Sequence, residues 1–195
     1  TGVKTAAGSE VNMAGYGFAA EISPFSASGK WNWMLKLGAA SGDNPGTTDI
    51  DEGFAFNKNY DVAMLLFNHP VGKGDFLRSG LVRDTSTSAS TQVDTDAISN
   101  VFYVSPSFSQ QIKDRLSWGG SLTYAILNQN PFVGNDISKN LGMEFDANLT
   151  YKPYDRFTWV NQVGLLFPGA AFNGGTLGYD NKFAYGISSK AAISF

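Results

Sequence analysis

Several features that would define a function are missing from this 195-residue sequence, which has no cysteine and one histidine. Without cysteine there is no disulfide framework, thiol nucleophile or cysteine-ligated metal site. The longest apolar run, residues 62–67, is far shorter than the roughly 18–20 residues of a membrane-spanning helix. The net charge of −3 comes without a basic cluster, so we expect no nucleic-acid partner.

What the sequence has instead is glycine, with 22 residues, and aromatic side chains, at 14%. From residue 141 to 152 apolar and polar residues alternate strictly. The odd positions are Leu141, Met143, Phe145, Ala147, Leu149 and Tyr151, and the even positions are Gly142, Glu144, Asp146, Asn148, Thr150 and Lys152. A strand places the two sets on opposite faces, whereas a helix mixes them around its circumference. The length of this segment matches the roughly 9–11 residues with which a tilted strand crosses a bilayer.

The same alternation recurs along the chain and predicts an all-β fold. It covers residues 14–22, 31–39, 102–112, 116–126, 157–167 and 183–195. We predict a transmembrane antiparallel up-and-down β-barrel with about seven or eight strands in this chain. A soluble β-sandwich also alternates, but its strands usually have about 5–6 residues.

The connections between these segments alternate between short and long. The short ones are residues 24–30, 113–115 and 153–156, and the long ones are residues 42–97, 128–140 and 168–181. Outer-membrane barrels have short periplasmic turns and long extracellular loops. We therefore expect the protein to lie in the outer membrane of a Gram-negative bacterium, with its C-terminus in the periplasm. Lipid and lipopolysaccharide would then surround the barrel.

The four tryptophans follow the short turns, because each strand that leaves such a turn begins with a hydrophobe-x-Trp step. They are Trp31, Trp33, Trp118 and Trp159. At a membrane interface an indole buries its ring and keeps its N–H in water, so we predict an aromatic belt at this edge, which Tyr151 and Phe195 join.

Phe195 ends an alternating segment and resembles the C-terminal recognition strand of outer-membrane proteins. This resemblance implies the barrel-assembly machinery as a partner. Seven alternating segments give an odd number, whereas bacterial single-chain barrels have even numbers. Either residues 1–10 supply a poor first strand, or the barrel continues before Thr1. We favour the second, so we expect residues 1–195 to be a single domain and the C-terminal part of a larger barrel.

Residues 42–97 are too long for a bare connector, and residues 59–70 are too apolar to stay in water. We expect the latter to fold into the lumen as a constriction or plug, to cap the barrel mouth, or to contact another protein. The candidate residues are Tyr60, Asp61, Met64, Leu66, Phe67 and His69. Residues 84–96 are rich in Ser, Thr and Asp and predict a solvated loop.

Five charged side chains point to the lumen by their position in the alternation: Glu21, Lys36, Glu144, Asp146 and Lys190. In a wide barrel they set ion preference, and in a narrow one they pair as structural salt bridges. We favour a pore lining.

Two further groups of residues raise alternatives that we rank lower. His69 would have to act with Asp or Ser in an outer-membrane hydrolase, but no partner is fixed by spacing. Oxygen ligands for Ca²⁺ are present at Asp43, Asn44, Asp49, Asp51 and Glu52, without EF-hand spacing. We therefore predict no enzyme, no metal and no cofactor.

Several short motifs carry a family resemblance. They are Ser41-Gly-Asp-Asn-Pro-Gly, Glu52-Gly-Phe, Asn59-Tyr-Asp and Leu65-Leu-Phe-Asn-His-Pro. Together they resemble the long extracellular loop in the C-terminal part of the alginate-export class of outer-membrane barrels. The resemblance implies a pore and leaves the cargo open. The lumen of that family is strongly basic, whereas here two lysines face three acidic residues.

The leading functional hypothesis is a porin-like channel for small solutes, with selectivity set by the lumen charges and by an inserted loop. The alternative is a structural barrel that anchors an envelope assembly, or a homo-oligomer, through exposed Phe54, Phe56 and Phe76. An outer-membrane hydrolase ranks last.

Overall fold

The structure is a computed structural model, and it describes residues 2–4, 10–23, 30–57, 59–67, 97–132, 136–173 and 181–195. Its main element is a seven-stranded antiparallel sheet with the strand order β10-β9-β8-β7-β6-β4-β3. The strands are β3 (Gly17–Ile22), β4 (Trp31–Ala40), β6 (Val101–Lys113), β7 (Leu116–Leu127), β8 (Asn140–Tyr154), β9 (Phe157–Pro168) and β10 (Ala184–Ile193). The prediction of an all-β, antiparallel up-and-down arrangement is confirmed.

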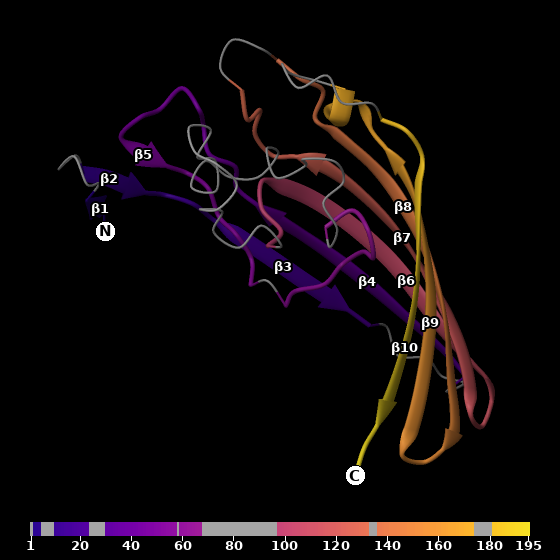
Figure 1. Ribbon diagram of the computed structural model, residues 1–195. Helices are drawn as coiled ribbons and strands as arrows, with labels where there is room; N and C mark the ends of the chain where they lie inside the picture. Colours follow the sequence, from indigo (N-terminus) through magenta and orange to yellow (C-terminus); the bar gives the residue numbers. More distant parts are fainter. Residues whose placement is uncertain are drawn as a thin grey trace.

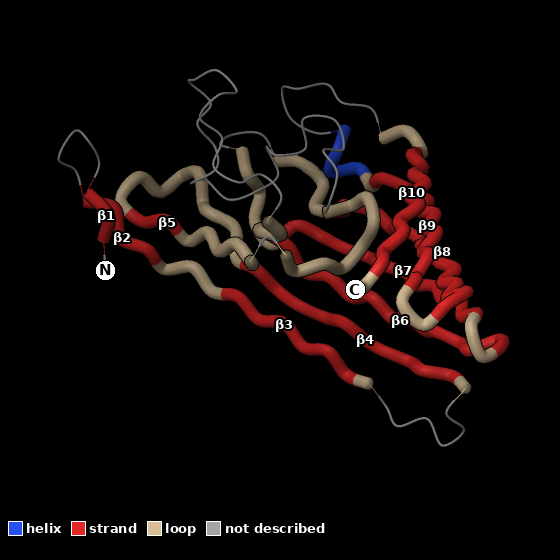
Figure 2. Tube along the Cα trace, turned by 60° about the horizontal axis from the view of Figure 1, so that its bottom comes forward, coloured by secondary structure: helices blue, strands red, loops and turns tan. Residues whose placement is uncertain are grey.

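The sheet is curved into a trough, and the loop segments that the structure describes lie over its hollow side (Figure 2). The trough is not closed, because β3 and β10 form the two edges of the sheet and do not pair with each other. The described residues therefore form an open wall, and the expected closed barrel is not present within them.

Each long strand has two faces of opposite chemistry. In β8 the side chain of Glu144 is fully buried on the hollow side, while Met143 and Phe145 are 46% and 44% exposed on the other. We call these the inner and the outer face. The exposed outer-face residues include Phe18, Trp33, Phe102, Val104, Trp118, Leu122, Tyr124, Leu149, Trp159, Phe167, Tyr185 and Ile187. The alternation in the sequence thus describes a sheet that buries its mixed polar face and exposes its apolar face.

Short turns and long connections lie at opposite ends of the sheet (Figure 1). Two-residue turns join β6 to β7 at Asp114–Arg115 and β8 to β9 at Asp155–Arg156. At the other end β1 (Gly2–Lys4), β2 (Glu10–Met13) and β5 (Ile50–Asp51) form a separate small sheet. Residues 2–4 therefore supply no strand of the main sheet.

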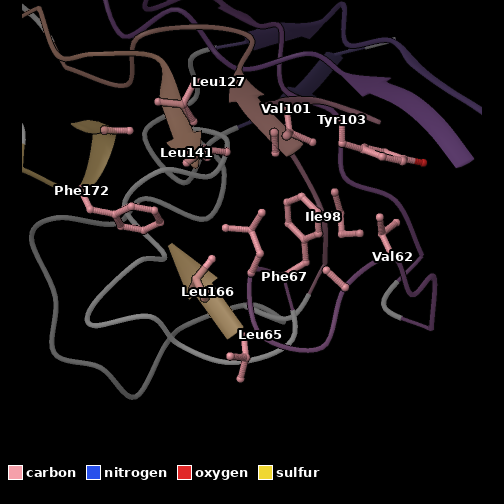
Figure 3. Close-up of a cluster of buried hydrophobic side chains, with 14 of the residues drawn as sticks. Val62, Leu65, Phe67, Ile98, Val101, Tyr103, Leu127, Leu141, Leu166 and Phe172 are labelled. Atoms are coloured by element: carbon pink, nitrogen blue, oxygen red, sulfur yellow. The ribbon is translucent and has the colours of Figure 1, made fainter. Parts of the chain in front are cut away.

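The hydrophobic core lies on the inner face, between the sheet and the loops. It contains Tyr103 and Leu166 from the strands, Leu66 and Phe67 from the loop after β5, and Phe172 from the 3₁₀ helix Ala170–Asn173. Figure 3 shows Phe67 among Leu166, Val101 and Ile98. None of the helices in the described part of the chain has the length and apolar character needed to cross a membrane.

Gly142 lies where β8 changes register against β7, between the pairs Ala125–Gly142 and Ile126–Asn140. Its φ is +101°, and a Cβ atom there would lie 2.2 Å from the backbone oxygen of Phe167. Residues other than glycine rarely adopt this conformation, and the nearby backbone leaves no room for one. Gly142 therefore fixes the start of β8 and the position of Glu144 two residues later.

We predict that Gly142→Ala lowers the free energy of unfolding by about 1–3 kcal/mol through backbone strain. Gly46→Ala is the control, because its Cβ would meet the side-chain oxygen of Asn44 at 3.3 Å and no positive φ is involved. Thermal unfolding followed by circular dichroism measures both. Equal unfolding temperatures for the two variants would contradict this role of Gly142.

Candidate functional site

Residues 59–67, which we call the inserted segment, lie against the inner face of the sheet. Val62, Ala63, Leu65, Leu66 and Phe67 are all buried there. The segment lacks regular secondary structure, so its backbone N–H and C=O groups need partners from elsewhere in the protein. The sheet supplies several of them.

The carboxylate of Glu144 binds the middle of the inserted segment. The backbone N–H groups of Leu65 and Leu66 donate to its two oxygens, each over 2.6 Å. Next to it on the same face of β8, Asp146 Oδ2 accepts from Met64 N and from Ser121 Oγ, both at 3.3 Å. Leaving a buried hydrogen-bonding group without its partner is costly. These two acids therefore hold the segment to the wall.

Lys36 on β4 holds the beginning of the segment. Its ammonium group donates to the backbone oxygen of Asp61 over 2.9 Å and forms an ion pair with Glu21 at 3.4 Å. The same ammonium lies 5.9 Å from the ring centre of Tyr60, within the range of a cation–π contact. Lys36 thus joins β3, β4 and the inserted segment.

Aromatic rings continue this attachment toward the loop end of the sheet. The hydroxyl groups of Tyr60 and Tyr103 are 2.6 Å apart, and Phe67 contacts Tyr103 with ring centres 6.1 Å apart. Phe56 packs against both Phe54 and Tyr60. Phe54 and Phe56 are half-buried, which corrects the expectation that they are exposed contact residues.

Glycines on the inner face make room for the inserted segment. A Cβ atom at Gly186 would lie 2.7 Å from Leu65 Cδ2, and one at Gly164 would lie 3.2 Å from the sulfur of Met64. At Gly17 the same atom would lie 2.1 Å from the ring of Phe54. The inner-face glycines thus allow close approach of the loop.

Between the inserted segment and the short turns, a part of the inner face that we call the lower inner face is not covered by any described loop. A hollow of about 740 Å³ is lined by Lys36, Asp61 and Met64 at its upper side and by Asn148, Gln162, Ser188 and Lys190 on the wall. A second hollow of about 470 Å³ shares Ser121 and Asn148 with it. The inserted segment therefore fills the loop end of the trough and leaves the turn end hollow.

The structure separates the five charged residues expected in the lumen. Glu21 and Lys36 pair with each other, Glu144 is buried under the inserted segment, and Asp146 and Lys190 line the larger hollow. Glu144 points to the inner face as expected, but it is not part of an open pore lining, because the inserted segment covers it completely. Tyr60, Asp61, Met64, Leu66 and Phe67 all belong to the inserted segment, whereas His69, Phe76 and residues 84–96 lie outside the described residues.

The tryptophans cluster on the outer face near the short turns. Trp31 stacks on Trp33 with ring centres 6.2 Å apart, and Phe108 contacts both of them and Trp118. The indole N–H of Trp118 donates to Gln110 Oε1 over 2.8 Å. Phe195 and Tyr151, the other residues predicted for the aromatic belt, are also exposed.

Ser189 interrupts the apolar series of the last strand, and the structure explains why. Its hydroxyl accepts the indole N–H of Trp159 over 2.8 Å and donates to Asn161 Oδ1 over 2.9 Å. The polar atoms on this part of the outer face thus satisfy one another.

The acidic side chains between positions 43 and 52 accept hydrogen bonds from groups within their own loop. Asp43 Oδ1 accepts the backbone N–H of Glu52, Glu52 Oε2 accepts from Asn44 N and Thr47 Oγ1, and Asp51 Oδ1 accepts from Gly53 N. Partial burial, with the nearby charges of Asp51 and Glu52, raises the pKa of Asp43. Within the part of the chain that the structure describes, no three acidic or histidine side chains are grouped as metal ligands.

Sequence reasoning missed Asn100, which joins the segment before β6 to the loop after β7 at the loop end of the sheet. It is buried with a φ of 51°. Its amide donates to Gln129 O over 3.0 Å and accepts from Gln129 N over 2.8 Å. Asparagine tolerates this left-handed conformation better than most residues, but a single Asn before a strand is too common to indicate such a role.

No protein-family model and no curated protein sequence matches this chain.

We predict that Glu144→Ala releases the inserted segment from the sheet. The amide protons of Leu65 and Leu66 then exchange with solvent roughly tenfold to hundredfold faster, because each loses its buried hydrogen bond to the Glu144 side chain. Hydrogen exchange resolved by mass spectrometry or NMR measures this, with protection in β8 and β9 as the check that the sheet is intact. Asp155→Ala in the exposed turn is the control, and unchanged exchange at Leu65 and Leu66 in Glu144→Ala would contradict the attachment.

Proposed function

We propose that this chain forms part of the wall of a transmembrane β-barrel in the outer membrane, and that the barrel is a channel narrowed by the inserted segment. The observation that carries the proposal is the outer face of the sheet. Exposed large apolar side chains occur along it on every strand of the seven-stranded sheet. A soluble monomer rarely exposes a continuous apolar patch larger than a few hundred Å², whereas hydrocarbon lipid is the natural environment for such a surface.

The two free edges of the sheet support the same proposal. Lipid offers no hydrogen bonds, so unpaired strand edges within it are very costly. We infer that β3 and β10 pair with further strands in the membrane and that the curved sheet is one section of a closed wall. The strand lengths agree, since β6 to β9 each exceed the roughly 9–11 residues that a membrane crossing needs.

The distribution of aromatic residues supports an orientation. The tryptophan cluster and Phe195 mark the end with short turns, which we assign to the periplasmic interface. The inserted segment then enters the lumen from the extracellular side, as part of the long loop between β4 and β6.

The inner face favours a channel over a closed anchor. Below the inserted segment it is lined by Ser, Asn, Gln, Lys and Asp side chains around two connected hollows. A structural barrel would be expected to fill this space with side chains, and Phe54 and Phe56, the proposed contact residues of such an anchor, are half-buried. We therefore propose a passive, non-enzymatic route for small solutes, with the segment as its constriction.

Replacing residues 60–67 with a short glycine-serine linker tests the channel. We predict that the full-length protein conducts ions in planar lipid bilayers, and that the replacement raises single-channel conductance severalfold because the constriction is removed. The control is the same linker in place of residues 44–49, at the rim and outside the inner face. A protein that inserts into bilayers and never conducts, with or without the segment, would contradict the proposal.

A further inference from the structure

The lower inner face carries a row of neutral hydrogen-bonding groups at one level of the sheet. Strand register pairs Asn148 with Gly119 and Gln162, and Gln162 with Ser188. On the other side it pairs Gly119 with Ser109, and Ser109 with Asn32. Amides and hydroxyls from β4, β6, β8, β9 and β10 are therefore aligned across the trough.

These groups face open space and are not used to hold the fold. Asn148, Gln162 and Ser188 line the hollow of about 740 Å³, and Asn32, Ser109 and Asn148 line the connected one of about 470 Å³. Both volumes fall within the roughly 300–1,000 Å³ of small-molecule sites. Among the described residues, the side chains of Asn32, Asn148 and Gln162 make no hydrogen bond.

The charges around the hollows are largely engaged by the protein itself. Lys36 is paired with Glu21 and bound to Asp61 O, and Asp146 Oδ2 accepts from Met64 N and Ser121 Oγ. Lys190 lies two residues past Ser188 on β10, toward the short turns, and is exposed. The hollow thus has Lys36, Asp61 and Asp146 at its upper side, next to the inserted segment, and Lys190 at its lower rim, with neutral polar side chains on the wall between them.

A wall of this kind suits one chemical class of solute. Each amide offers two donors and a carbonyl acceptor, and each hydroxyl offers both functions, so together they replace the water around a molecule that carries many hydroxyl groups. An ion that leaves water here would meet few opposite charges in return. We propose that the two connected hollows form a binding site for a neutral polyhydroxylated solute of mono- or disaccharide size on its way through the channel.

This inference rests on the proposed channel function, and sucrose tests it in two measurements. In planar bilayers we predict that sucrose interrupts the ion current of the full-length protein in a saturable manner. In liposome-swelling assays glucose and sucrose enter faster than charged solutes of similar mass. The proposed site is wrong if sucrose does not interrupt the current, or if solutes enter the liposomes according to their mass regardless of charge. Neither result would contradict the channel function.

The variant with both Asn148→Leu and Gln162→Leu locates the site. The half-blocking sucrose concentration rises roughly tenfold, which corresponds to about 1.4 kcal/mol of binding free energy, because the hydrogen bonds of both amides are lost, while the ion conductance persists. The matched control is Thr150→Val, on the same face of β8 but outside both hollows. An equal sucrose response in the double variant and the wild type would overturn the assignment.

If the protein conducts no ions, the proposed channel function is wrong, but the sugar site can still be tested. Saturation-transfer NMR with sucrose and the detergent-solubilised protein then decides the site by itself. Sucrose signals that depend on Asn148 and Gln162 support the site, and their absence overturns it.

Discussion

The carboxyl group of Glu144 accepts two backbone N–H groups of the inserted segment, while its sequence neighbours Met143 and Phe145 extend from the opposite face and are exposed. This division between neighbouring residues of one strand is repeated across the sheet. Among the described residues, a polar inner face that binds a loop and an exposed apolar outer face are the reverse of a soluble β-sandwich, where the apolar faces meet each other. We propose that another apolar medium covers the outer face.

The inner face of the sheet has few large side chains, and the inserted segment fills the space over it at the loop end. Glycines at 164 and 186 let the loop backbone approach the strands, and acids at 144 and 146 supply acceptors for its N–H groups. Tyr60 and Phe67 add aromatic contacts with Tyr103. Small polar residues also line the inner face on the side of the short turns, where no described loop covers them. There they leave the space that we assign to a solute.

The strands could be predicted from the sequence because their alternation is long and strict. Residues 141–152 and 157–167 were expected as strands, and β8 and β9 span Asn140–Tyr154 and Phe157–Pro168. The burial of residues 59–67 could be expected from their apolar character, but three positions remained open for them. The choice among these depends on which carboxylate meets which N–H, and Glu144 and Leu65 are 79 residues apart, a separation that no local pattern encodes. For the same reason the sequence predicts Glu144 as part of a pore lining and Phe54 and Phe56 as exposed, and it does not reveal the loop that covers Glu144.

The account depends most on the medium that touches the outer face. Because the chain has no cysteine, single cysteines at Phe145, Leu149, Asn148 and Thr150 can each carry a nitroxide label in protein reconstituted into lipid vesicles. Electron paramagnetic resonance then compares the access of oxygen, which concentrates in lipid, with that of a water-soluble nickel complex. We predict oxygen access at Phe145 and Leu149 and nickel access at Asn148 and Thr150. Nickel access at all four positions would mean that water covers both faces, which would contradict the membrane wall and the channel with it.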